Sequence, residues 1–216
     1  MTFSFDELSP LGYIIAIIIV FLMVKMYRES KNFNLRCVIS DIDGRKYCVR
    51  ERHKLGMAAD LLAKANRGMK ELVAHVGEQY STRENVKRLV ERFNPDAISE
   101  TLPTSEYTAY SENKGERIAF CLDETKTNDT GINKNTKKPE EYRSRLIDLN
   151  TLMFVAIHEL AHVASESVGH TDEFWSNFKF LLHEAEGLNI YKPIDYKNEP
   201  QEYCGMTITD NPYFDM

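Results

Sequence analysis

The pattern of apolar and polar positions begins with an apolar segment near the N-terminus. The stretch from Leu11 to Val24 contains no charged residue, and it extends over residues 8–27 if Lys25 reaches toward the membrane surface. A transmembrane helix needs about 20 predominantly apolar residues. The pattern therefore predicts a transmembrane anchor within residues 1–30, which binds a lipid bilayer through residues 8–27.

Two alternatives to an anchor conflict with the sequence. A signal peptide has basic residues before its apolar segment, whereas this chain has Asp6 and Glu7 there and no small-residue cleavage site afterwards. A buried helix that is apolar on every side needs a larger protein around it. Basic residues follow the segment, so the positive-inside rule predicts a single-pass membrane protein whose C-terminal domain lies on the cytosolic side.

After this segment the pattern becomes that of a folded domain. Alternating residues around Asp43 and Gly44 predict a β-hairpin from Leu35 to Val49. Apolar residues at helical spacing predict four helices, and a run rich in β-branched and aromatic residues predicts a strand. The helices span residues 50–80, 81–93, 148–169 and 172–187, with Ser81, Asp148 or Asn150, and Thr171 as caps, and the strand spans residues 117–122.

Other stretches have weaker patterns. Residues 102–111 fit a loop or an edge strand, and residues 123–139 have almost no apolar side chains, which predicts a mobile surface loop. The tail, residues 188–216, shows no clear periodicity and is expected to be extended and packed on the domain. The predicted fold class is α+β: a mainly helical single domain, residues 31–187, with a small β-sheet, preceded by one transmembrane helix.

Composition narrows the function. A chain of 216 residues has room for one domain beside the anchor, and its net charge of -6 argues against a nucleic-acid partner, because phosphate binding needs clustered Lys and Arg. The four cysteines form no CxxC pair, and most are expected to be free buried thiols. Cys37 and Cys48 lie on the two arms of the hairpin and would form a disulfide only in an oxidising compartment. In a cytosolic domain they stay reduced.

One motif carries chemistry. His158, Glu159 and His162 form an HExxH pattern, in which the two imidazoles lie one helical turn apart on one face. That spacing suits two ligands of one tetrahedral Zn²⁺, and a carboxylate beside the metal can act as a general base on water. The alternative is that both histidines are satisfied by neighbouring groups and that Glu159 pairs with a base. The apolar residues around the motif predict a buried helix, in which unpaired histidines would be costly.

A catalytic zinc needs a third protein ligand and an open position for water. His170 is the expected third ligand, because Gly169 can turn the chain back toward the metal. His183 and Glu184 are the second choice. The metzincin pattern fails, because Ser165 and Val168 occupy its glycine and third-histidine positions.

The stretch HELAHVASESVGHTDEFW, with RIAFCL upstream, resembles the WLM and SprT-like zinc peptidases over residues 115–187. This resemblance implies a zincin-like domain with its metal-site core in that range, zinc bound by His158, His162 and His170, Glu159 as the base, and Phe174 as the motif's aromatic. It also implies that the RIAFCL strand pairs with an extended protein or peptide substrate.

The whole chain also resembles membrane-tethered WLM-type proteins of large DNA viruses. That likeness implies a virion membrane as the location and viral capsid or membrane proteins as partners. The expected function is thus a membrane-anchored zinc metallopeptidase. The alternative is an inactive membrane-anchored structural or virion protein that retains the peptidase fold. Tyr191, Tyr196 and Tyr203 could each reach an oxyanion or simply pack in the core.

Overall fold

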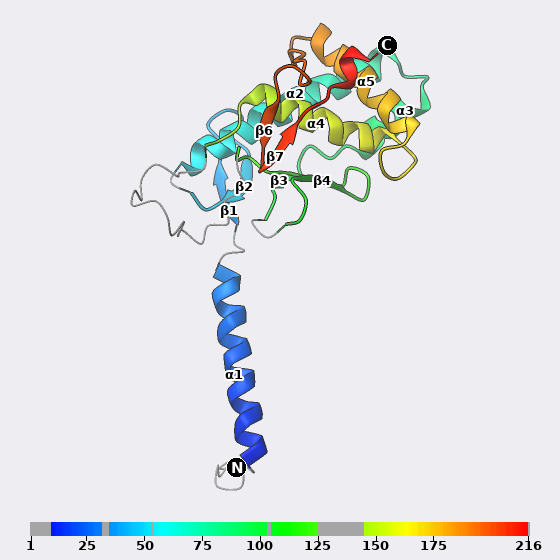
Figure 1. Ribbon diagram of the computed structural model, residues 1–216. Coiled ribbons are helices and arrows are strands. Elements are labelled where there is room, and N and C mark those ends of the chain that lie inside the picture. The colour runs from blue at the N-terminus through cyan, green and yellow to red at the C-terminus, as the bar shows by residue number, and fades with distance from the viewer. Residues whose placement is uncertain (1–9, 32–34, 53, 103–104, 125–144, 216) are drawn as a thin grey trace. The chain divides into compact units, whose positions relative to one another are not determined.

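The computed structural model describes residues 10–31, 35–52, 54–102, 105–124 and 145–215. The chain divides into two compact units, Met1–Asn34 and Leu35–Met216 (Figure 1). In the described part of the first unit there is one helix, α1 (Pro10–Lys31), and the second unit holds the other helices and the strands. The second unit is called the domain below.

Helix α1 coincides with the predicted transmembrane segment, but that prediction is wrong. Among the described residues, no helix is both long enough and apolar enough to cross a bilayer. The unbroken apolar run from Leu11 to Val24 comprises 14 residues, which is about 21 Å of helix, against roughly 30 Å of hydrocarbon in a bilayer. The helix then continues into charged positions, beginning with Lys25. The localisation that followed, a single-pass membrane protein with a cytosolic domain or one in a virion membrane, is wrong as well.

The domain is built on a mixed sheet in the order β1-β2-β3-β5-β4. Strands β1 (Leu35–Ile39) and β2 (Lys46–Arg50) form the predicted hairpin, which is confirmed. Strand β3 (Ile98–Glu100) lies parallel to both β2 and β5 (Arg117–Phe120). Strand β4 (Ala109–Glu112) pairs antiparallel with β5 and forms one edge of the sheet.

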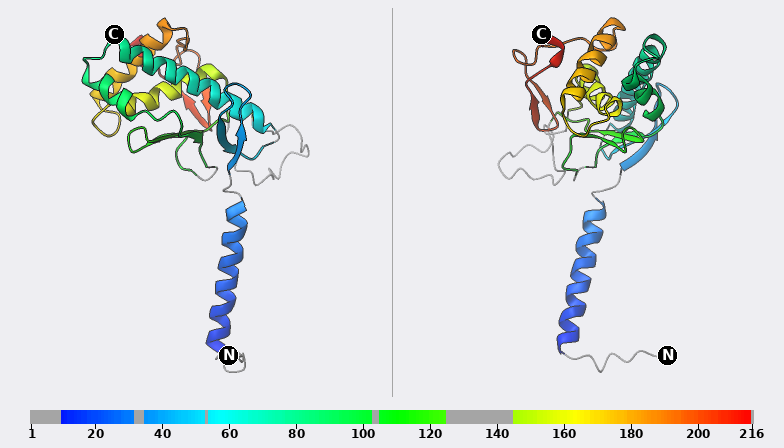
Figure 2. Two further views of the ribbon diagram at one scale, coloured as in Figure 1. Left: turned by 180° about the vertical axis from the view of Figure 1, so that it is seen from behind. Right: turned by 90° about the vertical axis from the view of Figure 1, so that its right-hand side faces the viewer.

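The helices of the domain lie on one face of this sheet (Figure 2). They are α2 (Leu55–Gln79), α3 (Glu84–Arg92), α4 (Leu149–Ala164) and α5 (Asp172–Gly187). Helix α4 is the central one, because it packs against α2, α3, α5 and β4. Its apolar side chains, such as Leu152 and Ile157, are fully buried together with Leu62 of α2 and Phe120 of β5.

The predicted fold class is therefore wrong. It gave a mainly helical domain with a small sheet after a transmembrane helix, whereas the described residues form five α-helices and a mixed five-stranded sheet. The missed strands explain the error. Strand β3 has only three residues, and all of them are buried. A segment this short, with both faces covered, gives no recognisable alternation of apolar and polar positions. Its partners lie far away in the sequence, and local patterns do not report such pairing.

The helix predictions differ from the structure mainly at their ends. Helices α2 and α5 are confirmed, and Thr171 caps α5 as expected. Helix α3 begins after Arg83 rather than at Ser81, and α4 ends at Ala164 rather than near Gly169. In the tail, β6 (Gln201–Tyr203) and β7 (Met206–Ile208) form a two-stranded sheet, followed by a 3-10 helix, η2 (Pro212–Phe214). The predicted mobile loop lies outside the described residues from position 125 onward.

All four cysteines form disulfides, so the prediction of free, reduced thiols is wrong. Cys37 pairs with Cys48 across the β1–β2 hairpin, where the two residues are direct neighbours in the strand register. Cys121, just after β5, pairs with Cys204, between β6 and β7. The second pairing was not visible in the sequence, because its cysteines have a sequence separation of 83. It fastens the C-terminal hairpin to the central sheet.

Candidate metal centre

Helix α4 places the motif residues. Its N-terminus is fixed by Asp148, whose carboxylate accepts hydrogen bonds from the backbone N–H and the hydroxyl of Thr151. Two turns later, His158 and His162 lie on one face with their ring centroids 4.9 Å apart. Glu159 lies beside them and is 5% exposed.

The third histidine reaches this face because α4 stops early. Ser165 adopts an extended backbone conformation and ends the helix at Ala164. The chain then turns at Gly169, whose φ of 85° lies in the left-handed region that favours glycine. As a result, Nε2 of His170 lies 3.1 Å from Nε2 of His158.

The three histidines form a group that fits a metal ion. One ligand nitrogen from each of His158, His162 and His170 lies within 4.8 Å of the others. A tetrahedral zinc with Zn–N bonds of about 2.0–2.1 Å separates its nitrogen ligands by roughly 3.3 Å. The ligand spacing therefore requires only small side-chain adjustments to close on such an ion.

Polar contacts hold the loop that carries His170. Glu173 accepts hydrogen bonds from the backbone N–H of Glu166 and from the N–H and hydroxyl of Ser167. These bonds, with Arg88 at 2.8 Å, lower the pKa of Glu173 to about 2. On the other side, Lys114 Nζ donates to the carbonyl oxygens of Ser165 and Ser167. The loop is thus fixed from both α5 and the turn after β4.

Aromatic rings form the floor of the site. Phe174 is fully buried, and its ring stacks on His162 at 4.3 Å and meets His158 and His170 edge-on at 4.8 and 4.7 Å. Phe178 lies 5.2 Å from His158. These apolar contacts exclude water from the inner side of the histidines and restrict their rotamers.

Burial sets the protonation of two histidines. It lowers the pKa of His158 to about 3, with smaller contributions from His162 and His170. It also lowers the pKa of His162 to about 4, with contributions from His170 and Lys114. Both imidazoles are therefore neutral at pH 7, which is the form that binds metal.

The carboxyl group of the motif shows the opposite shift. Burial raises the pKa of Glu159 to about 8. Tyr203 of β6 lies close by: its own pKa is raised by burial and then by the Glu159 carboxylate. The Tyr203 hydroxyl donates to the carbonyl oxygen of Thr108, 3.1 Å away, just before β4. A buried carboxyl with a pKa near neutrality can both accept and release a proton.

The other candidate residues lie elsewhere. Glu184 accepts a hydrogen bond from Tyr80 and contacts His75, and the His183 ring packs on Tyr213 at 4.3 Å. Neither belongs to the metal-binding group. Tyr191 and Tyr196 pack against Phe154, with ring centroids 6.0 and 4.9 Å away, so only Tyr203 of the three tyrosines lies beside Glu159.

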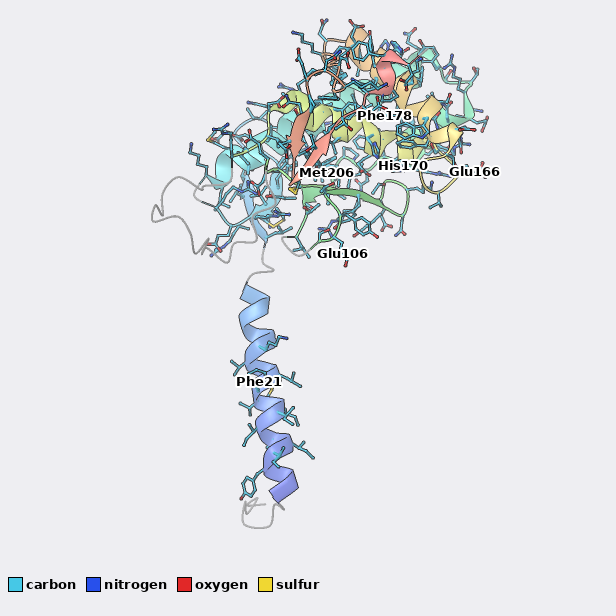
Figure 3. All side chains as sticks on the ribbon, viewed as in Figure 1. Phe21, Glu106, Glu166, His170, Phe178 and Met206 are labelled. Atoms are coloured by element: carbon cyan, nitrogen blue, oxygen red, sulfur yellow. A yellow bond between two sulfur atoms is a disulfide. The ribbon has the colours of Figure 1, made fainter. Side chains whose placement is uncertain are left out.

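The strand expected to pair with substrate is not at the edge of the sheet. The first four residues of RIAFCL form β5, which is paired on both sides, with β3 and β4. The neighbouring edge strand is β4, most of which lies in residues 102–111, the stretch predicted to be a loop or an edge strand. It packs against α4, and Figure 3 shows His170 on the α4 side of β4.

Sequence reasoning missed Lys114, Glu173 and Arg88, which hold the His170 loop. Glu173 had one usable signal, because acidic residues favour the first turn of a helix, where this one follows the cap Thr171. Lys114 had none, because its contacts reach about 50 residues along the chain, as between Lys114 and Ser165.

Comparison with known proteins finds viral relatives. The chain is 31% identical over 206 residues to "Uncharacterized protein R325" of Acanthamoeba polyphaga mimivirus, which covers 93% of this chain and 94% of that protein. Shorter matches are "Uncharacterized protein 136R" of Invertebrate iridescent virus 6, 42% identical over 57 residues, and "Uncharacterized protein 042R" of Invertebrate iridescent virus 3, 44% identical over 62 residues. These cover 26% and 29% of this chain, and 31% and 38% of those proteins. No family model and no solved structure matches the chain significantly.

Proposed function

We propose that this chain, which belongs to the same protein family as R325 of Acanthamoeba polyphaga mimivirus, is a zinc-dependent metallopeptidase. The observation that carries the proposal is the convergence of His158, His162 and His170 within 4.8 Å, beside the buried carboxyl group of Glu159. The arrangement is also the one implied by the resemblance to WLM and SprT-like peptidases.

The donor set favours zinc at an open site. Imidazole ligands suit Zn²⁺. Among the residues that the structure describes, the group consists of these three histidines. His170 is exposed, so one side of the site faces solvent. Three protein ligands and an open fourth position are typical of catalytic zinc, whereas structural zinc has four protein ligands. Bound there, the ion would supply Lewis-acid chemistry.

Glu159 is the proposed general base. The ionised carboxylate is the form that acts as a base, and a neighbouring Zn²⁺ would favour it over the protonated form that burial favours. In that form Glu159 would take a proton from the attacking water and pass it to the leaving amine. Phe174 and Phe178 keep bulk water from the inner side of the site. Lys114 and Glu173 act as positioning residues, because they fix the loop that holds His170.

The edge strand β4 is the proposed peptide-binding element. An extended peptide can add to a free strand edge through main-chain hydrogen bonds, which are independent of sequence. Because α4 packs against β4, a peptide held there passes the histidines. Such a peptide would bring a peptide bond beside Glu159, which is why we propose a peptide rather than a small soluble substrate.

Zinc content and proteolysis of the full chain test the proposal. We expect near one zinc per chain in the wild type, loss of zinc in His162→Ala and His170→Ala, and retention in Glu159→Gln. An unfolded protein substrate should be cleaved by the wild type, and Glu159→Gln should lower the rate by at least about 100-fold. His183→Ala is the matched control, because His183 lies outside the group, and both readouts should stay unchanged.

Two results would refute the peptidase. One is a wild-type protein that binds no zinc. The other is a zinc-loaded wild type that cleaves nothing, or cleaves as fast as Glu159→Gln, which would favour a structural protein that retains the fold.

A further inference from the structure

One large apolar side chain beside the histidines remains in water. Phe174 and Phe178 are buried beneath the site, whereas Trp175 between them is 44% exposed. The Trp175 ring centroid lies 5.7 Å from His170 and 5.1 Å from Phe174. The indole therefore borders the third histidine and faces solvent.

A second exposed apolar residue lies in the same region. Val168, two positions before His170, is 86% exposed. Its neighbour Ser167 is held at both backbone groups, with its N–H donating to Glu173 and its carbonyl oxygen accepting from Lys114. Because these bonds fix the backbone next to Val168, the loop presents this side chain to solvent in a defined position.

The loop that carries Val168 is connected to the segment after β4. Lys114 lies two residues after the end of β4 and contacts the loop at Ser165 and Ser167. The end of β4 therefore adjoins the loop that carries Val168. A peptide that binds along β4 and passes the histidines would then reach Val168 in this loop and Trp175 beside His170. Figure 3 shows Glu166, in the same loop, beyond His170.

We infer that Trp175 and Val168 form an apolar subsite, and that the substrate is an extended peptide with a large aliphatic or aromatic side chain next to the bond that faces the histidines. This rests on the proposed function, since it takes a peptide as the ligand. An indole offers a wide, rigid apolar contact at small conformational cost. An acidic side chain is disfavoured there, because its charge would lose hydration against the two apolar side chains.

The chain contains one tryptophan, so its fluorescence reports on this subsite alone. The probe is the full-length Glu159→Gln protein, loaded with zinc and titrated with blocked alanine hexapeptides that carry one Phe, Leu or Glu at each position in turn. The Phe and Leu peptides should give a saturable change and bind about tenfold more tightly than the all-alanine peptide. The Glu peptides should bind no better than the all-alanine peptide.

Val168→Ser keeps the fluorescent probe and should weaken binding of the best Phe peptide by about threefold to tenfold. The control is Ile39→Ser, another exposed aliphatic residue, 69% exposed, on the strand at the opposite edge of the sheet. It should bind like the parent protein.

Equal responses to the Phe, Glu and all-alanine peptides, or no response to any of them, would overturn the subsite. The proposed function is tested separately by incubating the same peptides with the wild-type protein. Selective binding without cleavage refutes the peptidase and supports the subsite, whereas cleavage without an apolar preference supports the peptidase and refutes the subsite.

Discussion

Glu159 should destabilise the zinc-free protein at neutral pH. Burial raises its pKa from 4.5 to about 8. A group whose pKa is higher in the folded state contributes fully to stability below its unfolded pKa, and that contribution is lost as pH rises toward the folded pKa. The zinc-free wild type should therefore lose stability between about pH 4.5 and 8 through this residue. Glu159→Gln carries no charge and should not show this loss.

The size of the effect follows from the shift. A pH of 7.5 lies three units above the pKa of the carboxyl group in the unfolded chain. Each unit corresponds to about 1.4 kcal/mol of unfolding free energy, so the destabilisation has an upper limit of about 4 kcal/mol. A buried glutamine also loses hydration, which reduces the gain. We expect Glu159→Gln to be more stable than the wild type by about 1–3 kcal/mol at pH 7.5, and by less than about 1 kcal/mol at pH 5.

Urea unfolding of the chelator-treated proteins, followed by circular dichroism from pH 5 to 8, measures this difference. The control is Glu106→Gln, an exposed glutamate outside the site (Figure 3). Equal stability of wild type and Glu159→Gln at pH 7.5, or a difference that does not grow between pH 5 and 8, would show that the folded protein does not raise the pKa of Glu159.

Three further predictions concern the loop that carries His170. Lys114→Met removes the donor to two loop carbonyl groups, so zinc affinity in a chelator competition should fall about 10-fold to 100-fold with the fold retained. Gly169→Ala places a side chain at a φ of +85° and should cost about 1 kcal/mol in urea unfolding. Gly187→Ala, which also meets nothing within 4 Å and has no positive φ, is its control. Glu173 has a lowered pKa of about 2, so its contribution to stability is present above about pH 4.5 and is lost as pH falls toward 2. Glu173→Gln should therefore have a lower melting temperature at pH 7 and a flatter acid dependence between pH 5 and 2.

The sequence predicted those parts of the structure whose signals are local. Helix α5 was predicted with its bounds and its cap, because Thr171 and the spacing of Phe174, Phe178 and Leu182 lie within one segment. The HExxH spacing placed His158 and His162 on one face for the same reason. The structure also brings His170 to them, with Gly169 in the conformation that the turn requires.

The parts that were missed depend on distant residues. Strands β3 and β6 have three residues each, and their positions are set by pairing rather than by composition. Tyr203 comes to Glu159 because a disulfide and a hairpin fasten the tail to the sheet. For α1, the sequence indicated an apolar helix, but the predicted membrane span of residues 8–27 was too long. The helix includes charged positions after Val24, and they interrupt its apolar part.

The Cys121–Cys204 disulfide also shapes the protein when it is not folded. Helix α4, His170 and α5 all lie between these cysteines, so the bond closes the metal-binding segment into a covalent ring with a sequence separation of 83. Such a ring restricts the denatured ensemble, and a chain-entropy estimate gives about 4.5 kcal/mol of stabilisation. A chain that has lost its metal and opened therefore keeps the three histidines within one closed loop. Renewed metal binding has to search only the conformations of that ring.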